Sequence, residues 1–244
     1  MKKNIYINKS TPLFCFDILD STMNEIKKKK YNIYNEVAVL ANQQTQGRGR
    51  RKNSWISDKG NLYLSIRFKK KIENNHHFIT YVMGIVLYDI IKKFISKPIK
   101  TFIKWPNDIY VDNKKVCGIL IEFLSYGNNI KEIIVGIGVN INNNPENLDK
   151  TSTFLKKYCN FSIESIKLTK SILIGINSWI EVLNDNKRII LEEWMKRSTK
   201  LNSKVKFHHN NKIVKGVYKG LAKDGSIEIL MENKKNNFFN LELI

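Results

Sequence analysis

The sequence is poor in the residues that mark disulfide-rich, zinc-clustered or membrane-spanning proteins. Its three cysteines, Cys15, Cys117 and Cys159, are isolated and odd in number, which argues against a disulfide framework and against a zinc cluster. The most apolar segment, residues 78–94, contains an aspartate and two lysines and is shorter than the roughly 20 apolar residues of a membrane-spanning helix. No apolar stretch that could form a signal peptide follows the N-terminal lysines. These absences predict a soluble, cytoplasmic protein that does not associate with membranes.

Acidic residues are also scarce: 22 Asp and Glu stand against 42 Lys and Arg, which gives a formal net charge of +20. Such an excess is typical of nucleic-acid-binding proteins. Here the lysines are spread among asparagines and isoleucines along the whole chain and form no single stripe or arm, as expected when a biased coding sequence fills tolerant surface positions. We therefore expect no specific nucleic-acid partner and keep a basic nucleic-acid-binding protein as an alternative. The four histidines, in two adjacent pairs, are interpreted as solvated surface residues.

Several catalytic sets are missing as well, since no Ser/His/Asp arrangement, zinc-ligand spacing or pair of carboxylates emerges. The hydrophobic content of 42% and the aromatic content of 11% are ordinary for a folded protein. A chain of 244 residues is long enough for one large domain and a small second one. We therefore expect a globular protein whose chemistry rests on arginine and lysine.

The pattern along the chain predicts an α+β fold. Strands are expected at residues 14–18, 37–41, 62–68, 100–105, 109–111, 116–124 and 132–141. Their close spacing after residue 99 is typical of an antiparallel or mixed sheet. Helices are expected at 78–94, 166–183 and 187–197. Thr22 and Glu25 have capping-box spacing, which predicts a further helix start.

A change of pattern near residue 200 predicts a second domain. Short strands at 204–207, 214–218, 226–230 and 238–243 are separated by turn residues, among them Asn236–Asn237, and suggest a small β-barrel. We therefore divide the chain into domains 1–199 and 200–244.

The segment QQTQGRGRRKNSW, residues 43–55, is the first candidate binding site. Gly47 and Gly49 allow backbone N–H groups to approach an anion, and Arg48, Arg50 and Arg51 offer planar donor forks that match a carboxylate or a phosphate. The spacing is neither that of a Walker A loop nor that of the dinucleotide fingerprint. The segment therefore predicts an anion-binding loop of another kind.

Further candidates follow in the second half of the predicted sheet. In KWPND, residues 104–108, Pro106 fits a turn, Asn107 can read the edge of a ring, and Asp108 can take a metal ion or a basic side chain. A plain turn is the alternative for these three, and core packing is the alternative for Trp55. In VGIGVN, Gly136 and Gly138 share one face of a strand, which suggests that a flat group lies on the backbone there; a close strand crossing is the alternative.

Taken in order, DST, GRGRR followed by a tryptophan, KWPND, KVCGIL and GIGVN resemble the motifs of the biotin protein ligase family. The resemblance covers nearly the whole chain. It implies a catalytic domain similar to class II aminoacyl-tRNA synthetases, followed by an SH3-like barrel. It also implies that biotin is activated with ATP and Mg²⁺ as biotinoyl-5'-AMP and passed to a lysine of the biotin carboxyl carrier protein of acetyl-CoA carboxylase or a related carboxylase.

The same resemblance implies a role for each matching residue. The residues implied to bind biotin are Ser21, Thr22, Gln44, Gly47, Arg48, Lys115 and Gly118. Those implied to bind ATP or the adenylate are Arg50, Arg51, Trp55, Asn107, Gly136, Gly138, Val139 and Asn140. Lys115, Arg48 and Arg50 would be catalytic, and Asp108 is a candidate ligand of Mg²⁺.

The sequence departs from the family pattern at two places. Lys52 and Asn53 stand where the family loop often has Gly and Arg, and the C-terminal NLELI lacks a glycine that is common before the final acidic residue. Only about 20 residues precede the Ser-Thr motif, so a single-function ligase, without a DNA-binding repressor domain, is expected. A lipoate or octanoate ligase of the same fold is the nearest alternative, and a monomer or a homodimer is expected.

Overall fold

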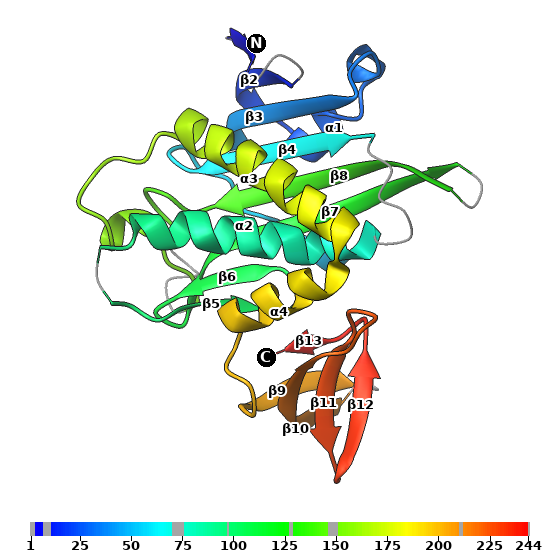
Figure 1. The fold of residues 1–244 in the computed structure, drawn as a ribbon. Coiled ribbons are helices and arrows are strands. Elements are labelled where there is room, and N and C mark those ends of the chain that lie inside the picture. The colour runs from blue at the N-terminus through cyan, green and yellow to red at the C-terminus, as the bar shows by residue number, and fades with distance from the viewer. Residues whose placement is uncertain are drawn as a thin grey trace.

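The computed structural model describes residues 3–6, 11–69, 76–96, 98–126, 129–145, 151–209 and 212–243. Within them, the chain forms a large mixed sheet covered by helices and a smaller antiparallel sheet near the C-terminus (Figure 1). The α+β class predicted from the sequence is therefore confirmed.

The large sheet contains eight strands in the order β1-β2-β3-β4-β8-β7-β6-β5. Their bounds are β1 Lys3–Tyr6, β2 Pro12–Leu19, β3 Glu36–Gln44, β4 Leu62–Phe68, β5 Thr101–Lys104, β6 Asp108–Val111, β7 Lys114–Tyr126 and β8 Asn129–Val139. Strands β2 and β3 pair in parallel, and the other neighbours pair antiparallel. The long β7–β8 hairpin places Gly118 directly opposite Gly138.

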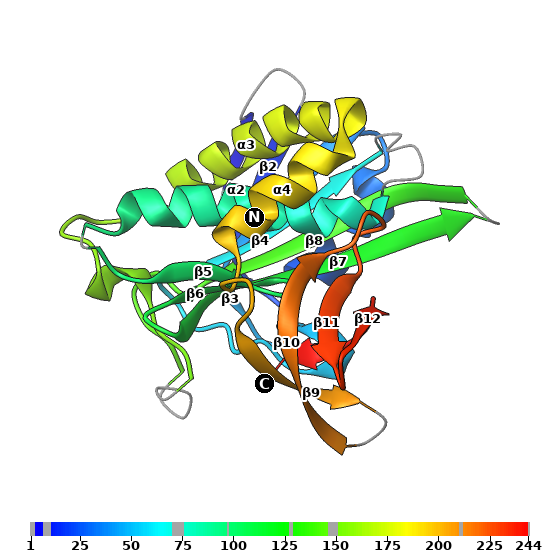
Figure 2. The same cartoon turned by 60° about the horizontal axis from the view of Figure 1, so that its bottom comes forward.

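Three long helices cover one face of this sheet (Figures 1 and 2). They are α2 Ile79–Phe94, α3 Ser165–Asp185 and α4 Lys187–Arg197. Apolar side chains of α2 are buried on most sides of the helix because it lies between the sheet and α3.

The opposite face of the sheet carries a second, smaller core. Along β8, alternate residues from Ile133 to Val139 face the helices, whereas Ile134 belongs to the second core together with Met23 and Val39. This alternation follows from the two-residue period of a strand. It leaves Gly136 and Gly138 on the face away from the helices.

The short helix α1 Thr22–Glu25 lies on that second face, and the capping box predicted for it is wrong. Ser21 is the N-cap residue, and no side-chain hydrogen bond caps the helix. Glu25 is buried and instead accepts a hydrogen bond from Tyr31 while it pairs with Lys28 and Lys30. The glutamate therefore ties α1 to the turn that follows it.

The C-terminal sheet has the strand order β12-β11-β10-β9-β13. Its strands are β9 Lys204–His209, β10 Lys212–Leu221, β11 Ile227–Met231, β12 Lys234–Phe238 and β13 Glu242–Leu243. The turn predicted at Asn236–Asn237 is wrong, because both residues pair within β12 and the chain reverses at Glu232 and Asn233, which have positive φ angles of 47° and 62°. The domain boundary near residue 200 stays a prediction.

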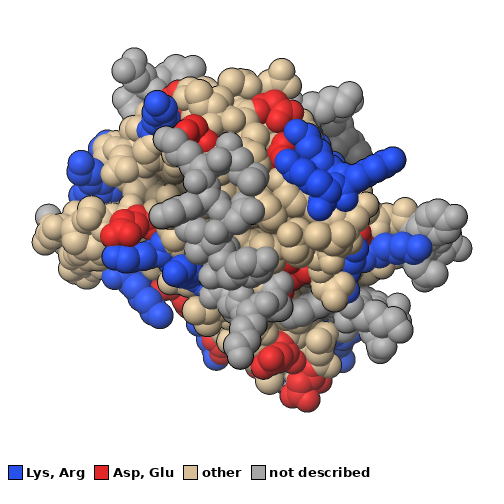
Figure 3. Space-filling view, turned by 90° about the horizontal axis from the view of Figure 1, so that it is seen from above, with Lys and Arg blue, Asp and Glu red and all other residues tan. Residues whose placement is uncertain are grey.

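The surface view shows Lys and Arg side chains in several separate groups on one face, with acidic side chains beside some of them (Figure 3). No helix in the described part of the chain is long and apolar enough to cross a membrane.

Candidate functional site

A cavity of about 630 Å³ lies along the glycine-bearing face of the sheet. Its walls come from the start of α1, from the loop that follows β3, from the KWPND turn, and from β7 and β8. They also include residues 145 and 151–152 and, from the C-terminal sheet, Leu243. Segments that are far apart in the sequence therefore meet at one site.

The loop between β3 and β4 is folded back on itself by backbone hydrogen bonds. Trp55 N donates to Gly47 O over 2.9 Å, and Gly49 N donates to Asn53 O over 2.7 Å. A Cβ atom at Gly47 would lie 2.2 Å from Trp55 O, so this position requires glycine. In this conformation the Gly49 N–H is bonded within the loop rather than presented to an anion.

A chain of side-chain hydrogen bonds anchors this loop to α1 and to the sheet. Ser65 Oγ donates to Thr22 Oγ1 over 2.8 Å, and Gln44 Oε1 accepts from Thr22 N over 2.8 Å and from Thr22 Oγ1 over 3.1 Å. Gln44 Nε2 then donates to Ser57 Oγ over 2.9 Å, and Ser57 Oγ donates to Trp55 O over 2.8 Å. The network fixes Thr22 and Gln44 in the cavity wall.

The flat group predicted to lie on the glycines is, in this structure, the indole ring of Trp55. Cβ atoms built at Gly138 and Gly118 would lie only 2.4 Å and 2.8 Å from atoms of that ring. Gly136 faces a different neighbour, because its Cβ would lie 2.7 Å from Met23 Sδ. We refer to Gly118 and Gly138, which pair across β7 and β8, as the glycine shelf.

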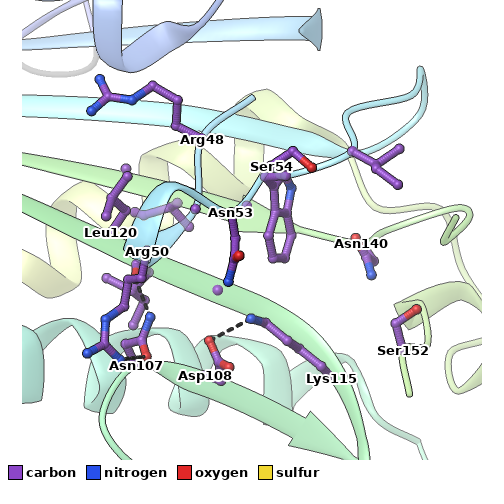
Figure 4. Close-up of a pocket in the computed structure, with 18 of the residues that line it drawn as sticks. Arg48, Arg50, Asn53, Ser54, Asn107, Asp108, Lys115, Leu120, Asn140 and Ser152 are labelled. Carbon is purple, nitrogen blue, oxygen red and sulfur yellow. Dashed lines mark hydrogen bonds and ion pairs between the residues drawn. The ribbon is translucent and has the colours of Figure 1, made fainter. Parts of the chain in front are cut away.

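Lys115 is held between an acidic and an aromatic group. Its Nζ lies 2.8 Å from Asp108 Oδ1 (Figure 4) and 5.1 Å from the centroid of the Trp55 ring. Its backbone N donates to Thr151 O over 3.0 Å, and Thr153 N donates back to Lys115 O over 2.8 Å. The 151–153 segment therefore supports the strand at the position of this lysine.

The loop arginines lie in different environments. Arg50 Nη1 donates to Asn107 Oδ1 over 3.0 Å, and Asn107 Nδ2 donates to Ile119 O over 2.6 Å. Arg48 points away from this group (Figure 4), forms an ion pair with Glu122 and donates to Asn24 Oδ1 over 3.0 Å.

A second cavity of about 590 Å³ adjoins the same loop. Its lining includes Gly47, Arg48, Arg50 and Glu122.

Two buried polar atoms in the wall of the main cavity have neither a hydrogen-bond partner nor an ion-pair partner among the described residues. They are Ser21 Oγ and Trp55 Nε1. A buried hydroxyl or indole N–H without a partner costs free energy. A polar ligand that reached either atom would supply the missing partner.

Most of the site residues predicted from the sequence line the main cavity. They are Ser21, Thr22, Gln44, Arg48, Arg50, Arg51, Trp55, Asn107, Asp108, Lys115, Gly118, Gly136, Gly138 and Asn140. Gly47 instead lines the second cavity, and Val139 is fully buried in the core under the helices. Asn53, one of the two departures in the loop, lines both cavities, whereas the side chain of Lys52 lies outside the described residues.

Other lining residues were not predicted. They include Met23, Tyr63, Tyr110, Leu120, Ser152 and Leu243. The two-residue period of β7 places Leu120 on the same face as Gly118, and this pattern was available in the sequence. No local motif points to Ser152 or Leu243.

Comparison with known proteins gives the family. A sequence profile described as the Biotin/lipoate A/B protein ligase family matches residues 15–140. The chain belongs to this family. The matched residues extend from β2 to the residue after β8 and include the loop, the KWPND turn, Lys115 and the glycine shelf.

Individual members of the family are similar over longer stretches. A "Bifunctional ligase/repressor BirA" of Escherichia coli (strain K12) is 25% identical over 215 residues, which cover 86% of this chain and 66% of that protein. A "Biotin--[acetyl-CoA-carboxylase] ligase" of Paracoccus denitrificans is 32% identical over 128 residues, or 52% of this chain and 53% of that protein. This chain therefore spans about half to two thirds of the length of these two family members.

The fold is shared with solved structures of the family. One of them, "Biotin protein ligase from Aquifex aeolicus in complex with biotin and ATP", superimposes with a TM-score of 0.83 and 26% sequence identity. The alignment covers 97% of this chain and 99% of that one. The likeness therefore extends over the C-terminal sheet as well as the large sheet.

Proposed function

We propose that this protein is an ATP-dependent biotin ligase, which activates biotin as biotinoyl-5'-AMP and transfers the biotinyl group to a lysine of a carrier protein. One observation carries the proposal: Lys115, Arg50 and Asn107 line a single cavity together with the glycine shelf. The solved structure from Aquifex aeolicus, which is described as a complex with biotin and ATP, supports the choice of these two substrates.

In the first step, a carboxylate oxygen of biotin would attack the α-phosphorus of ATP, and pyrophosphate would leave. Phosphoryl transfer depends mainly on alignment and on neutralisation of the phosphate charge. Lys115 Nζ, which lies beside Asp108 and over the face of Trp55, would contact both the carboxylate and the α-phosphate. Arg50, which is bonded to Asn107, would contact the phosphates from the loop side.

The two substrates would occupy different parts of the cavity. The ring of biotin would lie near Ser21, Thr22 and Gln44, where Ser21 Oγ has no partner among the described residues. Adenine would lie near Asn107 and Trp55. Because the indole ring of Trp55 lies on the glycine shelf in this structure, the indole has to shift if any ligand is to contact those glycines directly.

Magnesium fits this site only as a companion of the nucleotide. Asp108 is the sole carboxylate among the described residues that line the main cavity, and these residues include no cluster of three His, Cys, Asp or Glu side chains. Mg²⁺ commonly binds through one or two carboxylates together with substrate phosphates, and Asp108 could serve as such a carboxylate. Bound in this way, the ion would neutralise phosphate charge.

In the second step, the ε-amine of a carrier lysine would attack the acyl carbon of the mixed anhydride. The bond between that carbon and the phosphate oxygen would break, AMP would leave with the electron pair, and the amine would lose a proton. The anhydride must be kept from water until then, which is a task for the loop that lines both cavities. The name of the Paracoccus denitrificans relative supports acetyl-CoA carboxylase as the source of the carrier.

The deciding experiment measures pyrophosphate release from Mg-ATP with biotin, lipoate or octanoate, followed by addition of a biotin carboxyl carrier domain. We expect pyrophosphate release with biotin but not with lipoate or octanoate. After the carrier domain is added, we expect biotin to be attached to one carrier lysine. Turnover with lipoate or octanoate but not with biotin would identify a ligase of the same fold with a different acid substrate. No turnover with any of the three acids would contradict the proposal.

A further inference from the structure

A buried tyrosine on α2 joins the wall of the cavity to the C-terminal sheet. The side chain of Tyr81 is 6% exposed. Its hydroxyl accepts a hydrogen bond from Trp105 Nε1 over 3.4 Å and donates one to Gly225 O. Trp105 lines the cavity, and Gly225 lies in the turn between β10 and β11. One hydroxyl group therefore connects two segments that are 120 residues apart.

The hydroxyl has a specific task because both of its neighbours need it. An indole N–H can only donate and a carbonyl oxygen can only accept, whereas a tyrosine hydroxyl does both. Burial raises the pKa of Tyr81 to about 12, so the hydroxyl keeps the proton that it donates to Gly225. Without this group, a buried donor and a buried acceptor would both lose their partner.

The turn that contains Gly225 is seated closely against α2. The φ angle of Gly225 is +85°, and a Cβ atom built there would lie 3.1 Å from Tyr81 Cε2. His77, which precedes α2 and is partly buried, donates from Nε2 to Asp224 O over 3.1 Å. Because the contact is this close, a displacement of the turn would also displace the Tyr81 ring.

On the cavity side, Trp105 opens the turn that carries Asn107 and Asp108. It is 5% exposed, and its peptide bond to Pro106 is cis. Asn107 accepts a hydrogen bond from Arg50, and Asp108 forms an ion pair with Lys115. A shift of the Trp105 indole would therefore move the residues that are proposed to meet the nucleotide, whereas Ser21 and Gln44 on the biotin side belong to other segments.

We propose that Tyr81 is a positioning residue, which fixes the Trp105 indole and thereby makes nucleotide affinity depend on the Asp224–Gly225 turn of the C-terminal sheet. This inference rests on the proposed function in taking ATP as the nucleotide. It assigns a role in the site to a residue that does not line the cavity.

The first test replaces only the hydroxyl, with Tyr81→Phe, in the full chain. The four tryptophans give few indole N–H signals in an NMR spectrum of ¹⁵N-labelled protein, and Trp105→Phe identifies the signal of Trp105. We expect Tyr81→Phe to shift that signal and to speed its hydrogen exchange. We also expect the KM for ATP to rise roughly tenfold, which corresponds to about 1.4 kcal/mol, with little change in the KM for biotin.

Tyr218→Phe is the matched control. Tyr218 is 1% exposed and its hydroxyl lies 3.3 Å from Ser198 Oγ, so the variant also removes a buried hydroxyl near α4 but leaves the link to Trp105 in place. We expect wild-type values for the Trp105 signal and for the KM for ATP. Equal effects of the two variants would overturn the proposal, since they would indicate general loosening.

Two further variants test whether Tyr81 acts through the indole and the turn. In the Trp105→Phe background, Tyr81→Phe should change the KM for ATP by less than twofold; independent, additive effects would refute the route through Trp105.

Gly225→Ala should shift the Trp105 signal in the same direction as Tyr81→Phe, and an unchanged signal would refute the link to the C-terminal sheet. The indole signal can be recorded without biotin, and the affinity for ATP can be measured by calorimetry in place of the KM. The variants therefore decide the inference even if the proposed ligase activity fails.

Discussion

Replacing Gly138 by alanine tests the glycine shelf directly. A Cβ atom at this position would lie 2.4 Å from Trp55 Cε2 and 2.6 Å from Trp55 Nε1, whereas ordinary contacts begin at about 3.4 Å. The indole ring therefore has to retreat by about 1 Å. Gly136→Ala is the matched control on the same strand face, because its Cβ would meet the flexible thioether of Met23 at 2.7 Å.

The expected magnitude follows from this geometry. Overpacking of this kind commonly costs about 1–3 kcal/mol, and a gap of about 1 Å removes roughly a quarter to a half of the dispersion attraction. Trp55 is only partly buried and its loop can yield, so we expect a loss of about 1 kcal/mol in the free energy of unfolding. The displaced ring also alters the proposed adenine position, and we expect the KM for ATP to rise about tenfold.

The assay combines chemical denaturation with pyrophosphate release measured over a range of ATP concentrations. Gly136 also lines the cavity, but a thioether adapts to a new neighbour more readily than an indole does, so Gly136→Ala should raise the KM for ATP clearly less than Gly138→Ala does. A wild-type KM for ATP in Gly138→Ala, or equal effects of the two variants, would refute the role given to the shelf.

Further predictions concern the cations, a buried carboxylate and the core. Lys115→Ala should slow pyrophosphate release by about 100-fold or more, and Arg50→Gly should instead speed loss of the adenylate about tenfold, as followed by trapping free biotinoyl-5'-AMP. Burial by itself would raise the pKa of Glu25, but hydrogen bonds from two lysines and Tyr31 hold it below its ordinary value of 4.5. Glu25→Gln should therefore cost about 2 kcal/mol at pH 7, and this difference should shrink as the pH falls through the lowered pKa, which denaturation at several pH values would detect. Val139→Ala should cost about 2 kcal/mol in unfolding while the KM for ATP stays unchanged, because this side chain faces the helices.

Much of this fold could be predicted from local pattern. The expected strand at 62–68 and the helix at 187–197 match the observed bounds, because strand alternation and amphipathic spacing are local properties. Of the two alternating glycines of β8, Gly138 has the flat neighbour that the pattern indicated, whereas Gly136 faces Met23. That the neighbour is Trp55 could not be derived, since the contact depends on how a distant loop folds back over β7 and β8.

The wrong predictions have a common physical cause. Capping-box spacing at Thr22 and Glu25 was overridden because partners in the turn after the helix, Tyr31 and two lysines, bind the glutamate. The turn propensity of Asn236–Asn237 was overridden by pairing with β11. The support that Thr151 gives to Lys115 is made by backbone atoms, which leave no trace in residue type.

The two faces of the β7–β8 hairpin impose different rules on neighbouring residues. Residues such as Cys117 and Val135 fill a close-packed core, so most changes in volume there should lower the abundance of the folded protein. Gly118 and Leu120 face the cavity, so changes there should spare abundance more often and lower turnover. A complete substitution scan that records abundance and turnover separately should therefore show two interleaved sets of positions where the strands border the cavity, at residues 117–120 of β7 and 135–139 of β8.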